Sequence, residues 1–255
     1  MSGPLLQVSI RVPAELREQA IARLLELAPD GFEERNDPDA TVFLVYTDDA
    51  GRASLREAFA SVDSNAVEPG WEDGWRVFHR PVRAGGLWIG PPWEDPPAGE
   101  PTVVIDPGRA FGTGSHPTTR LCADLLARLP RGSLVDVGCG SGVLAIAAVR
   151  LGFAPVTAID VDVVAVEATR ANADLNGALV DASVVDALQD PLPSADVAVA
   201  NILLRPVETV LGRLEASTVV TSGYLEGERP RHSGWSHVET ATLEGWAADV
   251  FVRSA

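Results

Sequence analysis

The sequence contains no lysine, because all 20 of its Lys-or-Arg positions are arginine. This absence excludes enzymes that depend on a lysine, such as those that form a Schiff base, anchor pyridoxal phosphate or bind a nucleotide through a P-loop lysine. The chain therefore carries no side-chain amine. Any catalysis or ligand binding has to use its carboxylates, amides, hydroxyls, histidines and backbone.

Cysteine and long apolar runs are also scarce. The two cysteines are Cys122, in an apolar helical pattern, and Cys139, inside a glycine-rich turn. We interpret both as packing residues of a reduced protein without disulfides. No apolar stretch approaches the roughly 20 residues needed to cross a bilayer, and the first residues do not resemble a signal peptide. We therefore expect a cytoplasmic protein that does not bind membranes.

Positive charge is in deficit, with a formal net charge of −16. The chain has no basic stripe that could neutralise phosphates, so we expect no direct binding to nucleic acid. An acidic surface would instead attract a basic partner. A charge that serves only solubility explains the same composition equally well.

The 255 residues divide into three segments by pattern. Residues 1–65 follow a β-α-β-β-α-β order, which predicts a small ferredoxin-like α+β domain. Residues 66–101 form a connector rich in tryptophan and proline. Its four tryptophans favour packing between domains over a substrate groove; they are Trp71, Trp75, Trp88 and Trp93. Residues 102–255 alternate strands with helices, which predicts an α/β domain with a seven-stranded, mostly parallel, doubly wound sheet.

The pattern places the elements of this last segment quite closely. We expect strands at 133–137, 156–160, 182–185, 197–201, 219–223, 236–240 and 247–252. We expect helices near 118–129, 143–151, 163–176 and 206–214, with Gly177 ending the third of them.

The most informative motif lies in this segment. Asp136 ends an apolar strand and is followed by Gly138, Gly140 and Gly142, then by a helix and a second strand that ends at Asp160. A dinucleotide site would have Gly-x-Gly-x-x-Gly spacing and no carboxylate facing the pyrophosphate. A carboxylate suits a ligand with an ammonium and a sulfonium group. The pattern resembles class I S-adenosylmethionine (SAM) methyltransferases, and it disfavours a nicotinamide oxidoreductase.

A second block identifies the family more narrowly. The run DPGRAFGTGSHPTT at 106–119, followed by the glycine motif and by Asn201-Ile202-Leu203, closely resembles the ribosomal protein L-eleven methyltransferase (PrmA) family. The resemblance covers most of residues 70–225. It implies methyl transfer from SAM, with S-adenosylhomocysteine as product and no metal.

The resemblance also implies a set of site residues. It places SAM contacts at Thr119, Gly138, Gly140, Asp160 and Asn201, and a loop over the methionine portion of SAM that contains Phe111, Gly112 and Thr113. Asp160 would accept hydrogen bonds from the ribose hydroxyls. Asp186 is either an adenine contact or a solvated loop acid. His116 more often braces such a loop than acts as a base.

Asn201 is the expected catalytic residue, because its side-chain oxygen can accept a hydrogen bond from a neutral amine. Related enzymes that methylate adenine often carry an aromatic residue shortly after this Asn, and this chain has Leu203-Leu204 there. We therefore expect an aliphatic amine rather than a nucleobase as acceptor. By resemblance the substrate is large-subunit ribosomal protein L-eleven, free of the ribosome, methylated on lysine and α-amino groups and recognised by residues 1–65.

Other assignments stay open at this point. The chain could methylate another protein or a small amine, or it could bind SAM without catalysis. One departure from the family concerns the substrate pocket: residues 225–234 are too short and broken to form the full helix that family members carry there. His232 and His237, in or near this stretch, are expected on the surface.

Overall fold

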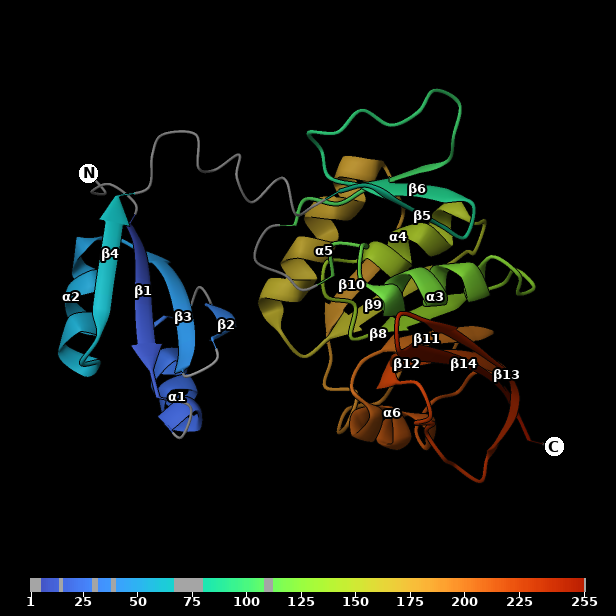
Figure 1. Ribbon diagram of the computed structural model, residues 1–255. Coiled ribbons are helices and arrows are strands. Elements are labelled where there is room, and N and C mark those ends of the chain that lie inside the picture. Colours follow the sequence, from blue (N-terminus) through green and yellow to red (C-terminus); the bar gives the residue numbers. More distant parts are fainter. Residues whose placement is uncertain are drawn as a thin grey trace. The chain divides into compact units, whose positions relative to one another are not determined.

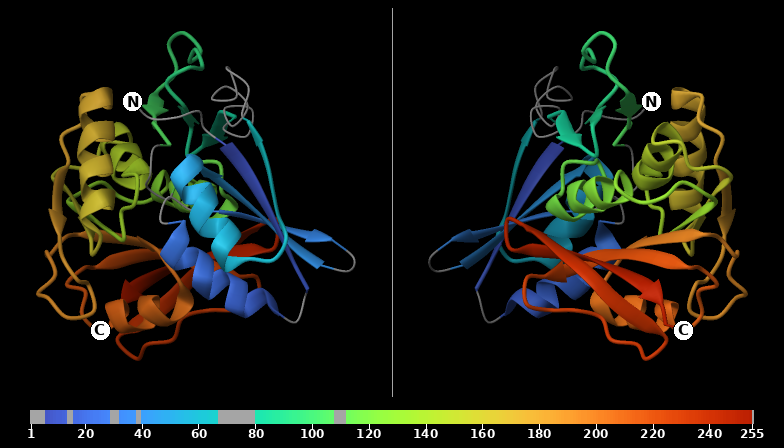
Figure 2. Two further views of the ribbon diagram at one scale, coloured as in Figure 1. Left: turned by 90° about the vertical axis from the view of Figure 1, so that its left-hand side faces the viewer. Right: turned by 90° about the vertical axis from the view of Figure 1, so that its right-hand side faces the viewer.

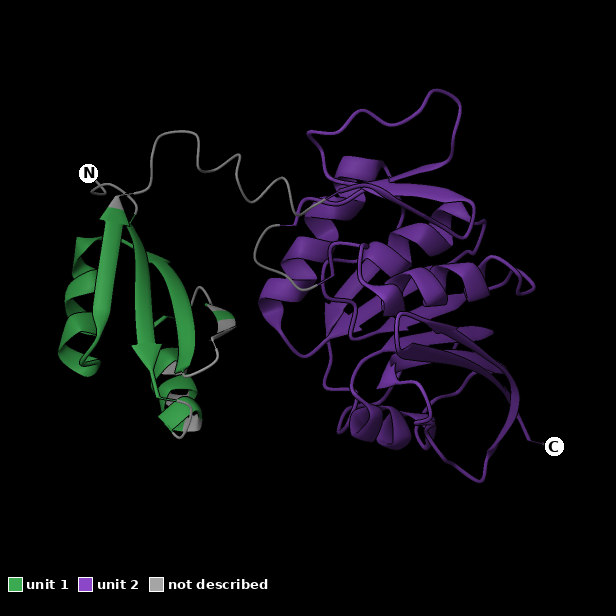
Figure 3. Cartoon of the chain, viewed as in Figure 1, with its two compact units in different colours: residues 1–76 green, residues 77–255 purple. Residues whose placement is uncertain are grey.

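The computed structural model describes residues 6–13, 16–28, 32–37, 40–66, 80–107 and 112–254. It divides into two compact units, residues 1–76 and 77–255 (Figure 3). None of the described helices is long and apolar enough to cross a membrane.

The first unit is an antiparallel sheet with two helices. Its elements are β1 (Leu6–Val12), α1 (Arg17–Leu27), β2 (Glu33–Asp37), β3 (Ala40–Thr47), α2 (Asp49–Ala58) and β4 (Val62–Ala66). The strand order is β2-β3-β1-β4. Alternate residues of β1 turn inward and share one core with Leu24 of α1 and Leu55 of α2, so both helices cover the same face (Figure 2).

The second unit is built on a mixed sheet with the strand order β10-β9-β8-β11-β12-β14-β13. The strands are β8 (Leu134–Val137), β9 (Val156–Asp160), β10 (Asp181–Val184), β11 (Val197–Asn201), β12 (Thr218–Leu225), β13 (Trp235–Leu243) and β14 (Trp246–Arg253). The first five in this order are parallel, whereas β14 pairs antiparallel with both neighbours. The expected α/β arrangement with a mostly parallel sheet is confirmed.

Helices cover both faces of this sheet (Figure 1). The helices α3 (Pro117–Leu126), α4 (Val143–Arg150) and α5 (Val163–Asn176) share one core cluster on one face, and α6 (Leu204–Leu211) packs on the other. As predicted, α5 ends at Gly177, which has a φ of 58°.

Residues 80–101 of the expected connector belong to the second unit. Their strands β5 (Val82–Ala84) and β6 (Leu87–Gly90) form a small sheet with β7 (Thr102–Val104), which directly follows the connector. Leu87, Ile89 and Val103 are buried in the same cluster as α3 and α4. Trp88 is buried as well, whereas Trp71 and Trp75 lie outside the described residues.

The segment between β12 and β13 contains no helix over residues 226–234, as expected. Arg229 of this segment instead reaches Asp249 of β14, whose side chain is fully buried, with an Nε–Oδ1 distance of 3.2 Å. The other donors to Asp249 are His237 at 2.9 Å, the Tyr224 hydroxyl at 2.8 Å and the Thr240 hydroxyl. His232 and His237 are both exposed, but this contact ties His237 to the sheet. We call these five side chains the Asp249 cluster.

Candidate active site

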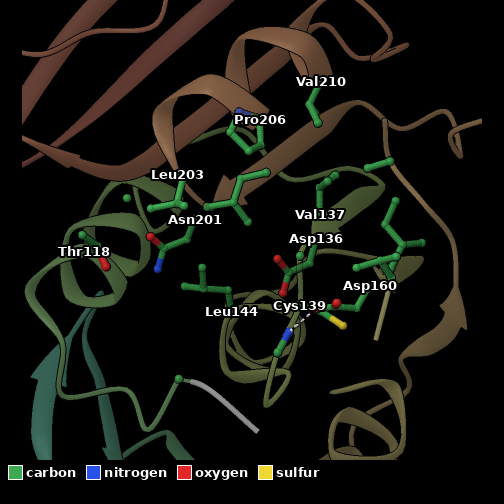
Figure 4. A pocket seen from close by; sticks show the side chains of 18 of the residues that line it. Thr118, Asp136, Val137, Cys139, Leu144, Asp160, Asn201, Leu203, Pro206 and Val210 are labelled. Atoms are coloured by element: carbon green, nitrogen blue, oxygen red, sulfur yellow. Dashed lines mark hydrogen bonds between the residues drawn. The ribbon is translucent and has the colours of Figure 1, made fainter. Parts of the chain in front are cut away.

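The carboxyl ends of β8, β9 and β11 open into one cavity of about 540 Å³. Parallel α/β sheets place their ligands at this edge, and the volume is typical of a site for a small molecule. Figure 4 shows Asp136, Cys139 and Asp160 toward one end of the cavity and Thr118, Asn201 and Leu203 toward the other. The two ends therefore differ in chemistry, one acidic and the other carrying amide, hydroxyl and apolar groups.

The glycine-rich turn, residues 138–142, lies at the acidic end, where Gly140 contacts Asp160 (Figure 4). Gly138 has a φ of 75°, and a Cβ at this position would collide with the Ile202 side chain. Gly142 has a φ of 82°, and a Cβ there would come within 2.8 Å of Thr169 Cγ2. Glycine is required at both positions because the backbone is left-handed and neighbouring side chains occupy the space. Gly138 and Gly140 of this turn line the cavity with their backbone.

Asp160 ends β9 and is held by two backbone groups. Its Oδ2 accepts a hydrogen bond from Gly140 N–H and its Oδ1 from Asp162 N–H, each at 3.0 Å. A carboxylate oxygen has more than one lone pair, so both oxygens can accept a further donor from the cavity. The two bonds orient the carboxylate for a diol before any ligand binds.

Asp136 is the last residue but one of β8; it lines the cavity and is almost fully buried. Its Oδ2 accepts the Ala145 N–H at 3.0 Å. Burial raises the pKa of Asp136 to about 7, the Ala145 N–H opposes that rise, and the nearby charge of Asp160 adds to it. A cationic ligand next to this carboxyl would favour its ionised form.

Asn201 and Thr119 meet at the opposite end. Asn201 Nδ2 donates to Thr119 Oγ1 at 3.3 Å, which leaves the Asn201 side-chain oxygen without a hydrogen bond from any described residue. Thr119 is the third residue of α3 rather than its cap. The contact orients the amide so that its oxygen can accept a hydrogen bond from a group in the cavity.

His116 caps α3, three residues before Thr119. Its Nδ1 lies 2.7 Å from Thr118 Oγ1 and accepts the Thr118 N–H at 3.4 Å. Its ring packs edge-on against Trp246, with centroids 4.8 Å apart. Burial lowers the pKa of His116, and the charge of Glu244 opposes that shift. These contacts favour the interpretation of His116 as a brace.

The remaining expected site residues are more scattered. Gly112 lines the cavity, and its carbonyl oxygen accepts a hydrogen bond from the Ser141 hydroxyl. Thr113 is absent from the lining, and its hydroxyl lies 3.0 Å from Ser115 Oγ. Asp186 lines the cavity, but its carboxylate already accepts from Leu188 N–H and Gln189 Nε2. Phe111 lies outside the described residues.

One side of the cavity was not predicted from the sequence. Leu203, Pro206, Gly223 and Trp246 line it next to Asn201, and we call them the apolar wall. Trp246 supplies an aromatic side chain from β14, so the absence of an aromatic residue after Asn201 does not mean that this end lacks one. The available signal was the Glu244-Gly245 pair, a two-residue turn that brings the start of the last strand to this edge.

The chain is similar to known proteins over most of its length. A family model described as ribosomal protein L11 methyltransferase (PrmA) matches residues 10–253. A ribosomal protein L11 methyltransferase of Laribacter hongkongensis is 42% identical over 233 residues, which cover 85% of this chain and 77% of that protein. One from Legionella pneumophila (strain Philadelphia 1) is 39% identical over 202 residues, which cover 72% of this chain and 69% of that protein.

The fold of this chain is also similar to that of a solved structure with the same description as these relatives. The ribosomal protein L11 methylase of Lactobacillus delbrueckii subsp. bulgaricus has a TM-score of 0.62 and 28% identity, with 69% of this chain and 100% of that chain covered. The fold is thus class I methyltransferase-like, an α/β fold with a mixed sheet. The chain belongs to the ribosomal protein L11 methyltransferase (PrmA) family.

Proposed function

We propose that this protein transfers methyl groups from SAM to lysine and α-amino groups of ribosomal protein L11. The observation that carries the proposal is the arrangement of the cavity. At one end the glycine-rich turn helps to orient Asp160 for a ribose, and at the other end the Asn201 side-chain oxygen accepts no hydrogen bond from a described residue. SAM supplies an electrophilic methyl on a sulfonium, and the product is S-adenosylhomocysteine.

The residues present fit SAM in charge as well as in size. SAM carries a sulfonium, an ammonium and one carboxylate, so its net charge is positive, and three carboxylates line the cavity, those of Asp136, Asp160 and Asp186. We assign the ribose to Asp160 and the methionine portion to Thr119, Gly138, Gly140 and Asn201, with Phe111, Gly112 and Thr113 as a covering loop. We assign the adenine amino group to Asp186, which lines the cavity. No metal enters this assignment.

Asn201 then positions the acceptor. A lysine amine has a pKa of about 10.4 and must become neutral before its lone pair can attack. The apolar wall removes water from the amine, and a neighbouring sulfonium further disfavours the ammonium form. The Asn201 oxygen accepts one N–H and aims the nitrogen at the methyl carbon. As the N–C bond forms and the C–S bond breaks, the extra proton leaves to solvent, so positioning is the main requirement.

We propose that the first unit recognises the protein substrate. Its element order and its β2-β3-β1-β4 sheet support a ferredoxin-like domain, and the strand order of the second unit supports the seven-stranded methyltransferase sheet. The net charge of −16 suits a basic protein partner and opposes contact with RNA. We therefore infer that L11 is methylated before it joins the ribosome, in the cytoplasm.

Replacing Asp160 tests the cofactor assignment. Asp160→Ala removes two charge-assisted hydrogen bonds to the ribose, so we expect SAM affinity in calorimetry to fall by at least about tenfold. Asp162→Ala is the matched control, because Asp162 caps α5 two residues away and does not line the cavity. An unchanged dissociation constant in Asp160→Ala would remove Asp160 from the cofactor site.

The pH dependence of SAM binding tests Asp136. With a pKa of about 7, Asp136 is mostly protonated at pH 6 and mostly ionised above pH 7.5. Because a cation prefers the ionised form, we expect SAM affinity to rise between these values, by at most about tenfold per pH unit. Asp136→Asn keeps an acceptor for Ala145 N–H and should flatten the rise. Identical pH profiles for the two proteins would contradict the pairing of Asp136 with SAM.

Label transfer tests the function and its acceptor together. Radiolabelled SAM is incubated with the full chain and either free L11 or intact large ribosomal subunits. We expect label in the protein band of free L11, and much less in assembled subunits. Label in ribosomal RNA alone, or in neither acceptor, would overturn the proposed function.

A further inference from the structure

The tip of the β13–β14 hairpin has an unfavourable backbone. The turn consists of Glu244 and Gly245, with φ angles of 53° and 81°, as in the two-residue turns that favour Asn-Gly or Asp-Gly. Glu244 is the one non-glycine residue in the described part of the chain with a positive φ. Such strain persists where the surroundings enforce it, often at functional sites.

The Glu244 carboxylate forms an ion pair with Arg120, and the Arg120 side chain also has an unfavourable feature. Arg120 of α3 donates to Glu244 Oε1 through Nη1 at 3.2 Å. The Nε of Arg120 is buried and has no hydrogen-bond partner among the described residues. Glu244 is 62% exposed, and an ion pair so open to solvent contributes only about 0–1 kcal/mol to stability. A contribution to stability therefore does not explain why the chain keeps both the positive φ of Glu244 and the buried, unbonded Nε of Arg120.

The pair connects two sides of the cavity. Arg120 directly follows Thr119, which holds the Asn201 amide, and Glu244 stands two residues before Trp246 of the apolar wall. Trp246 in turn packs edge-on against His116, the cap of α3. The hairpin tip thus rests on the first turns of α3 through one ring contact and one ion pair.

We propose that Arg120 and Glu244 are positioning residues that hold the hairpin tip on α3 and so set the place of Trp246 at the acceptor end of the cavity. This inference rests on the proposed function. The ion pair fixes the place of Trp246 relative to Asn201, and with it the alignment of the incoming amine. The SAM contacts on the glycine-rich turn and on β9 do not depend on it, and the hydrogen bond between Asn201 and Thr119 forms without it.

Glu244→Asn separates this role from a role in folding. Asparagine adopts a positive φ more readily than glutamate, and Asn-Gly is a preferred turn pair, so the hairpin should be at least as stable as in the parent. The ion pair is lost. We therefore expect an unchanged or higher melting temperature and an unchanged SAM affinity, while methylation of free L11 under single turnover slows by at least about fivefold.

Two variants of the partner complete the test. Arg120→Met keeps the length of the side chain without its charge and should slow methylation as Glu244→Asn does, whereas Arg120→Lys should restore most of the rate. The matched control is Arg128→Met, because Arg128 and Glu239 form another ion pair of 3.2 Å between the end of the α3 region and β13, away from the cavity. It should leave the rate unchanged.

The outcomes are distinct. If the parent transfers methyl groups to L11 and both Glu244→Asn and Arg120→Met do so at the parental rate, the positioning role is wrong and the proposed function stands. Equal loss of rate in Arg128→Met would also overturn it, because any surface ion pair would then have the same effect. If the parent itself transfers nothing to L11, the proposed function fails, and this inference with it.

Discussion

Asn201→Ala should lower the turnover of L11 methylation by about 100-fold or more while SAM affinity falls far less. The substitution removes the oxygen that accepts the amine N–H, and a reactant held out of line by about 1 Å can lose that factor in rate. The contacts that we assign to SAM at Gly138 and Asp160 remain. The measurement compares single-turnover rates at saturating L11 with SAM dissociation constants from calorimetry.

Asn201→Asp is the sharper control for this prediction. It keeps an oxygen acceptor of nearly the same shape but adds a negative charge, which stabilises the ammonium form of the amine. We expect its rate to recover as the pH rises, because the amine is then deprotonated more often. If Asn201→Ala methylates L11 at the parental rate, another group orients the amine and the mechanism is wrong.

Asp249→Ala should lower the free energy of unfolding by about 3 kcal/mol. Asp249 is fully buried and accepts from Arg229, His237, Tyr224 and Thr240, so its removal leaves a buried hydroxyl and a guanidinium without their shared acceptor. Denaturant unfolding of the full chain measures the change, with the slope of the transition checked for loss of cooperativity.

A surface ion pair provides the comparison for the Asp249 cluster. Asp49 lies 2.6 Å from Arg52 within α2, and its side chain is 60% exposed. Asp49→Ala should change stability by less than about 0.5 kcal/mol. If both variants unfold at the same denaturant concentration, the Asp249 cluster does not hold the segment that stands in place of the helix.

Much of the second unit could be predicted because its signals are local. The apolar strand, the three glycines and the following helix lie within one continuous stretch, and Asp160 ends the next strand, so their spacing along the chain nearly determines their geometry. The end of α5 at Gly177 is equally local, since only a residue that tolerates positive φ suits that position.

The rest of the site depends on pairing between distant segments. Trp246 reaches His116 only because β14 inserts between β12 and β13, and no local pattern specifies which face of the hairpin meets α3. The same holds for Arg120 and Glu244, which are far apart in sequence and form an ion pair common on any surface. The burial of Asp249 could not be predicted from the sequence, because an isolated Asp in a strand usually faces solvent.

The most direct test of the proposed reaction is mass spectrometry of free L11 after incubation with the full chain and SAM. The enzyme has no lysine of its own, so every methylated lysine in the mixture belongs to the substrate. We predict methyl groups on lysine side chains or the α-amino group of L11 with the parent protein, and almost none with Asn201→Ala. An L11 that gains no methyl group from a parent protein shown to bind SAM, or that gains one on a group other than an amine, would contradict the account.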